Sequence, residues 1–224
     1  MAVQTDISRR CAGSRLRAEY VLAGLAVLSL ALIPVRVTTI YSGLPAHPLF
    51  LHVPVMLIPV AVVWALVLVA RPGWFIRSGV LLGVLTVVAL AATFLTVGAG
   101  KALQAALHLS GGFGPAALVA RHAHAGELLR DLMILFTGAV IVALFAHRVA
   151  AGQTSGIAWL DGLAAHRVVL VLSRIALAVL AVACVYFVFH TGDLGAKAVW
   201  QGRLNGGPPG GGGRPVQQLF SPGG

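Results

Sequence analysis

Residues 49–70 read LFLHVPVMLIPVAVVWALVLVA, a run in which His52 is the one titratable side chain. A helix needs about 20 mostly apolar residues, each rising about 1.5 Å, to cross the hydrocarbon core of a bilayer. This run is therefore long enough to span a membrane. Further runs of similar length and composition cover residues 20–40, 78–98, 128–147 and 168–190. The sequence predicts an all-α membrane protein: a four-helix transmembrane core plus one extra N-terminal transmembrane helix.

The overall composition agrees with a membrane protein. Hydrophobic residues make up 58% of the chain and charged residues 10%, whereas soluble domains average about 45–50% and about 25%. The net charge of +10 would also suit a nucleic-acid partner. However, the basic residues lie at the ends of apolar runs, as in membrane proteins, and are not interleaved with aromatic side chains that stack on bases. We therefore expect the lipid bilayer as a partner and exclude nucleic acid.

Arginines mark the predicted cytoplasmic side. Because positively charged loops stay in the cytoplasm, the arginine pattern predicts a multi-pass protein with a cytoplasmic N-terminus and an extracytoplasmic C-terminus. The gaps between apolar runs on the opposite side contain only two lysine or arginine residues, Lys101 and Arg121. The marking residues are Arg9, Arg10, Arg15 and Arg17 before the first run, Arg71 and Arg77 after the second, and Arg148 and Arg167 after the fourth. The first run could also be a signal peptide, but it is long for that role and no A-x-A site follows it, so we favour a retained helix.

The chain divides into four predicted segments. Residues 1–19 form an Arg-rich cytoplasmic arm, 20–40 the extra transmembrane helix and 41–202 the four-helix membrane core. Residues 203–224 form a Gly- and Pro-rich tail that buries too little apolar surface to fold, so we expect it to be disordered. Cys11 and Cys184 lie in the arm and inside the last apolar run, so no disulfide framework is expected. No internal repeat is evident in the sequence.

Histidines gather at the predicted outer end of the core. Most of the eight histidines fall there: His47, His52, His108, His122, His124 and His190. His124, Glu127 and Asp131 share one helix face because they are spaced i, i+3 and i+7. Titratable side chains at one membrane surface can bind an exposed cofactor, a metal ion or protons. This end is the predicted functional site.

The predicted function is electron transfer through a bound cofactor. Haem in a helix bundle takes axial ligands from different helices, commonly histidine. The candidate ligands are first His52 and His124, then His47, His122 and His190. Neutral imidazole also binds copper or zinc, and Glu127 or Asp193 could then complete the coordination of the metal. The cofactor expected is therefore haem b or a Cu/Zn ion.

A second hypothesis comes from the motifs that the sequence lacks. No G-x-S-x-G, P-loop, G-x-G-x-x-G or H-E-x-x-H pattern is present, so the sequence leaves enzymatic activity open. Short loops and small-residue helix faces also suit a non-catalytic membrane scaffold or accessory subunit that binds a membrane protein partner or a second copy of the chain. Under this hypothesis the histidines would fix helix ends rather than hold a cofactor.

Three motifs connect the chain to a known family. Residues 43–54 read GLPAHPLFLHVP, residues 191–200 read TGDLGAKAVW, and residues 124–127 read HAGE. Over about residues 41–202 the chain resembles the bacterial membrane-protein family called domain of unknown function 2231. The resemblance implies a four-helix core in the bacterial plasma membrane and transfers no established activity. The Arg-rich arm and first helix are an addition to that core. We also expect the first and last motifs to meet at the outer surface.

Overall fold

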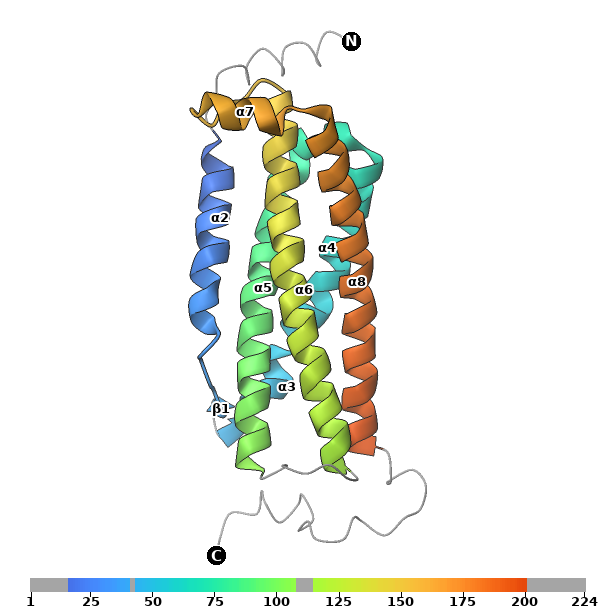
Figure 1. The fold of residues 1–224 in the computed structure, drawn as a ribbon. Coiled ribbons are helices and arrows are strands. Elements are labelled where there is room, and N and C mark those ends of the chain that lie inside the picture. Colours follow the sequence, from blue (N-terminus) through green and yellow to red (C-terminus); the bar gives the residue numbers. More distant parts are fainter. Residues whose placement is uncertain (1–15, 41–42, 108–114, 201–224) are drawn as a thin grey trace, which may run out of the picture.

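The computed structural model describes residues 16–40, 43–107 and 115–200. A bundle of four long helices dominates it: α4 (His52–Ala70), α5 (Phe75–Ala106), α6 (Pro115–Ala150) and α8 (Arg167–Trp200). The helices alternate in direction along the bundle (Figure 1). The short helix α3 (Ala46–Phe50) leads directly into α4. Residues 1–15 of the predicted arm and the predicted tail 203–224 lie outside the described residues.

The prediction of four long apolar helices is confirmed. Within the described part of the chain, four helical segments of 25 to 35 residues are long and apolar enough to cross a membrane. They are Ala46–Ala70, Pro72–Ala106, Ala116–Ala150 and Arg167–Trp200. Each includes one of the apolar runs and extends beyond it at one or both ends. The fold is therefore compatible with an integral membrane protein.

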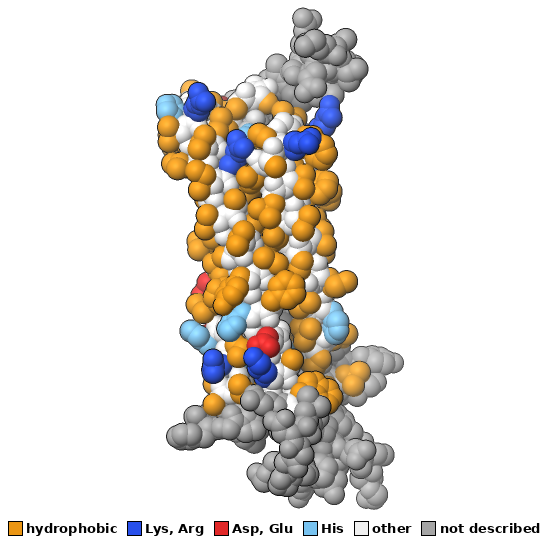
Figure 2. Space-filling view, turned by 90° about the vertical axis from the view of Figure 1, so that its right-hand side faces the viewer, with side chains coloured by type: hydrophobic (Ala, Val, Ile, Leu, Met, Phe, Trp, Pro, Cys, Tyr) orange, Lys and Arg blue, Asp and Glu red, His pale blue; other side chains and the backbone are white. Residues whose placement is uncertain are grey.

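Apolar side chains cover both the inside and the outside of the bundle. Phe94, Met133 and Leu177 are buried between the helices, whereas Leu135 and Val179 are exposed on the outer surface. A helix in a soluble protein would carry polar residues on its outer face, but a helix in lipid carries apolar ones all round. Figure 2 shows this apolar belt, with charged side chains gathered toward the two ends.

The two ends of the bundle differ in chemistry. The basic end contains four arginines in or beside the α4–α5 and α6–α8 connections, namely Arg71 between helices and Arg77, Arg148 and Arg167 in the adjoining helix ends. It also contains the short helices η3 (Pro72–Trp74) and α7 (Ala158–Ala164). The histidine end contains His47, His122, His124 and His190. Arg174 of α8 donates a hydrogen bond to the Val69 carbonyl, 2.7 Å away, and so satisfies the last turn of α4 at the basic end.

The structure does not confirm a single membrane-spanning helix over residues 20–40. Helix α2 (Arg17–Ser29) has 13 residues and is followed by one 3-10 turn, η1 (Leu30–Leu32). At about 1.5 Å per residue, α2 is about 20 Å long, which is less than the hydrocarbon thickness of about 30 Å. Pro34 has no N–H group with which to continue the helix. The chain then runs extended to strand β1 (Thr39–Ile40), which pairs antiparallel with β2 (Leu44–Pro45) near the histidine end.

Specific contacts hold this N-terminal segment along the bundle (Figure 1). At the basic end, the Glu19 carboxylate of α2 lies 3.0 Å from Arg148 Nε of α6, and its side chain is 2% exposed. Farther along, the Val35 carbonyl lies so close to Gly98 of α5 that a Cβ atom there would collide with it. Arg36 donates hydrogen bonds to the Ile33 and Val35 carbonyls, which lie outside regular secondary structure.

Candidate functional site

His47 joins the first helical segment of the core to α5. Its Nδ1 lies 2.9 Å from the carbonyl oxygen of Thr96. Because a carbonyl oxygen only accepts hydrogen bonds, the neutral ring must carry its proton on Nδ1. The ring rests against Gly100, where a Cβ atom would lie 3.0 Å from Nδ1. Gly100 therefore allows the imidazole to approach α5 closely.

His122 makes the same contacts between α6 and α8. Its Nδ1 donates to the carbonyl oxygen of Thr191, 2.9 Å away. The ring rests against Gly195, where a Cβ atom would lie 3.0 Å from Cε1. The Thr191 hydroxyl is buried and has no hydrogen-bond partner among the described residues. Both histidines are half-buried.

The two imidazoles meet at the centre of the histidine end. Their ring centroids are 6.0 Å apart, and the rings meet edge to face at 82°. Because both rings carry the proton on Nδ1, each presents Nε2 as a lone pair. A histidine that binds a metal commonly donates its other ring N–H to a backbone carbonyl, which fixes the tautomer and the ring orientation. The His47–His122 pair has this arrangement on both sides.

These matching contacts reveal an internal repeat in the bundle. Along the sequence, His122 follows His47 by the same number of residues as Leu144 follows Val69. Likewise, Thr191 follows Thr96 by the same number of residues as Arg174 follows Gly79. The first half consists of α3, α4 and α5, and the second half of α6 and α8. Arg174 contacts Val69, and Gly79 lies against Leu144, so both contacts join equivalent positions across the two halves. Buried positions also correspond. The pairs are Ile58 with Met133, Leu68 with Ala143, Leu82 with Leu177, Ala89 with Cys184 and Ala99 with Leu194.

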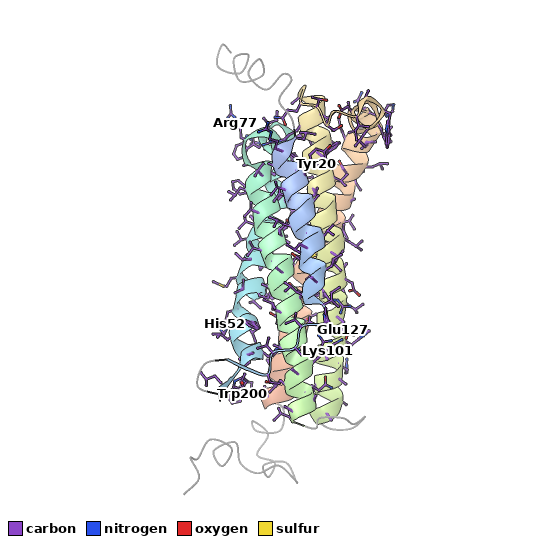
Figure 3. All side chains as sticks on the ribbon, turned by 90° about the vertical axis from the view of Figure 1, so that its left-hand side faces the viewer. Tyr20, His52, Arg77, Lys101, Glu127 and Trp200 are labelled. Carbon is purple, nitrogen blue, oxygen red and sulfur yellow. The ribbon has the colours of Figure 1, made fainter. Side chains whose placement is uncertain are left out.

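The first-choice pair of the sequence analysis, His52 and His124, is not the pair that the structure brings together. His52 is exposed on α4. Figure 3 shows it on the edge of the bundle away from Lys101 and Glu127. His124 is exposed on α6 and, together with His190 of α8, lines a surface cleft of about 350 Å³. His190 also stacks on Tyr186, with ring centroids 5.8 Å apart.

The carboxylates predicted to assist a metal ion form ion pairs with lysines instead. Glu127 pairs with Lys101 of α5, and Figure 3 shows the two side chains next to each other. Asp193 lies 2.6 Å from Lys197, one turn later in α8. Among residues 16–40, 43–107 and 115–200, no group of three or more His, Cys, Asp or Glu side chains is placed to hold a metal ion. A metal at this end would therefore rely on the two imidazoles.

The sequence analysis missed the groups that position the histidines. Thr96 and Gly100 on α5, like Thr191 and Gly195 on α8, form a T-x-x-x-G pattern that occurs once in each half. The pattern was a detectable signal, but its meaning depends on which helix packs against it. The first and last motifs each contact His122 of α6, through His47 on one side and through Thr191 and Gly195 on the other. A direct contact between the two motifs stays a prediction.

Comparisons with protein-family models, curated proteins and solved structures find no match to this chain. The resemblance of residues 41–202 to domain of unknown function 2231 therefore stays a prediction. Function has to be inferred from the histidine end itself.

Proposed function

We propose that this integral membrane protein binds a transition metal between His47 and His122 and uses it in electron transfer. The single observation that carries the proposal is the paired geometry: two imidazoles from different helices in contact, each with Nδ1–H fixed by a backbone carbonyl. Such hydrogen bonds orient the ring and raise its basicity as a ligand. Four apolar helices support a location in a membrane. The arginines of the basic end favour an orientation in which that end faces the cytoplasm.

A metal ion fits this pair better than haem b. The two rings lie next to each other, with their centroids 6.0 Å apart, and imidazole nitrogen is a good ligand for copper and zinc. Copper would supply the redox chemistry, whereas zinc would not. A haem needs a flat slot beside its ligand, and the cleft at this end is lined by His124 and His190 rather than by the His47–His122 pair. Copper is therefore the preferred cofactor of this proposal.

Asparagine variants provide the sharpest test. In His47→Asn and His122→Asn the side-chain amide can still donate to the carbonyl of Thr96 or Thr191, but the Nε2 ligand is gone. We expect the purified wild-type protein to bind about one copper ion per chain, and each variant to lose it without losing thermal stability. His166→Asn, at an exposed histidine of the basic end, is the matched control and should bind metal normally. Wild-type protein without stoichiometric metal would refute the proposal, and a Soret band would reassign the cofactor to haem.

The second candidate function is a non-catalytic scaffold or accessory subunit. It is favoured by the pairing of Glu127 and Asp193 with lysines, which leaves the predicted carboxylate ligands engaged in structural contacts. The hydrogen bonds of His47 and His122 would then serve to join helices. Under this alternative the wild-type protein carries no metal in the same experiment and is recovered in stable association with another membrane protein or a second copy.

A further inference from the structure

We infer that the cleft between α6 and α8 at the histidine end binds the anionic phosphate headgroup of a membrane lipid. The site is separate from the His47–His122 pair. Its polar wall consists of Arg121, His124 and His190, and its apolar wall includes Leu128, Phe187 and Leu194. The cleft has a volume of about 350 Å³ and opens on the outer surface of the bundle. Its occupant must therefore combine a polar head with an apolar chain.

The internal repeat shows that the fold does not need these polar residues. The positions in the first half that correspond to Arg121, His124 and His190 are Ala46, Leu49 and Leu95. The same helix pairing is thus formed in the first half with apolar side chains at these three positions. Three basic or titratable side chains thus gather in the second half only. Their presence in one half only is explained by a ligand that binds to that half.

The charges around the cleft favour an anion. All three acids described at the histidine end are already paired, Glu127 with Lys101, Asp131 with Arg130 and Asp193 with Lys197. Within the described part of the chain, Arg121 has no acidic partner, so the cleft keeps a positive charge. A guanidinium forms strong, often bidentate hydrogen bonds with phosphate, and imidazole N–H groups can add to them.

The position of the cleft favours a lipid over a soluble phosphate. The cleft lies where the apolar belt ends, which is the depth of the headgroups when α6 and α8 span a bilayer. Leu128 and Phe187 lie on the side of the cleft nearer the middle of the bundle, so a phosphate beside Arg121 would have its acyl chain against these apolar side chains. A free phosphate ester would leave that apolar wall unused.

Substitution by the first-half residues tests the site with little risk to folding. The full-length protein in detergent is titrated with phosphatidylglycerol or phosphatidylcholine, and bound lipid is counted by native mass spectrometry. We expect the wild-type protein to prefer phosphatidylglycerol. The triple variant Arg121→Ala, His124→Leu, His190→Leu should bind it about tenfold more weakly or worse, because charged hydrogen bonds are lost.

Arg77→Ala, which removes one exposed arginine from the basic end, is the matched control and should bind phosphatidylglycerol like the wild type. Free glycerol phosphate, added in place of lipid, should bind far more weakly because it lacks the acyl chain. Equal lipid binding by the triple variant and the wild type would overturn the inference. Equal binding of glycerol phosphate and phosphatidylglycerol would overturn the assignment to a lipid.

Discussion

The histidine pair depends on two glycines that permit close approach. The ring of His122 lies against Gly195, and its Nδ1 is held by Thr191, so the ring cannot move away without losing that hydrogen bond. We expect Gly195→Ala to displace the ring and to lower the free energy of unfolding by about 1–3 kcal/mol, as overpacking does. Denaturation in mixed SDS micelles measures this change. Metal affinity should fall in parallel under the proposed function.

Gly192 provides the control for that experiment. It lies one turn earlier in α8, and no atom lies within 4 Å of where its Cβ would be. Gly192→Ala should leave the protein unchanged or stabilise it by up to about 1 kcal/mol, since alanine favours a helix interior over glycine. If both alanine variants behave alike, the close approach of His122 to α8 is not important for the site.

At the scale of single elements, the largest difference from the sequence analysis concerns residues 20–40. Their apolar composition predicted one spanning helix, yet helix α2 and η1 together end at Leu32. Hydropathy is averaged over a window, so it does not detect the helix break at Pro34. It also does not detect that Gly98 leaves room for the extended segment around Val35. The burial of Glu19 against Arg148 was also hidden, because the partner lies on α6, far away in the sequence.

The Glu19–Arg148 pair should control the docking of α2. Removing one member of a buried ion pair leaves the other charge uncompensated and typically costs about 3–5 kcal/mol. We therefore expect Glu19→Gln to detach α2 and to expose the segment around Pro34 to proteolysis. Glu127→Gln is the matched control, because its pair with Lys101 is about one-third exposed and is worth less than about 1 kcal/mol. Equal protease sensitivity of the two variants would contradict this role.

At the scale of the whole molecule, the sequence was sufficient for the four core helices and for which groups gather at each end. Long apolar runs and arginine positions carry that information directly. The site itself was only partly predictable: the sequence placed six histidines at one end but could not tell which ones face each other. His47 and His52 illustrate the reason, because they lie in different helices, α3 and α4, although only five residues apart. The internal repeat was largely hidden as well, since beyond the matching His, Thr and Gly residues most equivalent buried positions differ in residue type.

The distribution of arginines predicts the orientation in the membrane, and the prediction can be tested on the whole chain. Reporter fusions after Arg77, Gly112, Gly156 and Gly206 should read cytoplasmic, outside, cytoplasmic and outside, because Arg71, Arg77, Arg148 and Arg167 lie in or beside the connections at the basic end. A reporter fused to the N-terminus tests a separate point, namely whether the segment that contains α2 crosses the membrane. Leu16 lies at the basic end, where its N–H donates to the Thr154 carbonyl, and β1 lies near the histidine end. The segment between them therefore passes along the full bundle, and the N-terminal reporter should read cytoplasmic. If the N-terminal reporter reads outside while the other four fusions read as expected, α2 does not cross the membrane with the core. If the four other fusions read the opposite way, the histidine pair and the lipid cleft lie at the cytoplasmic surface.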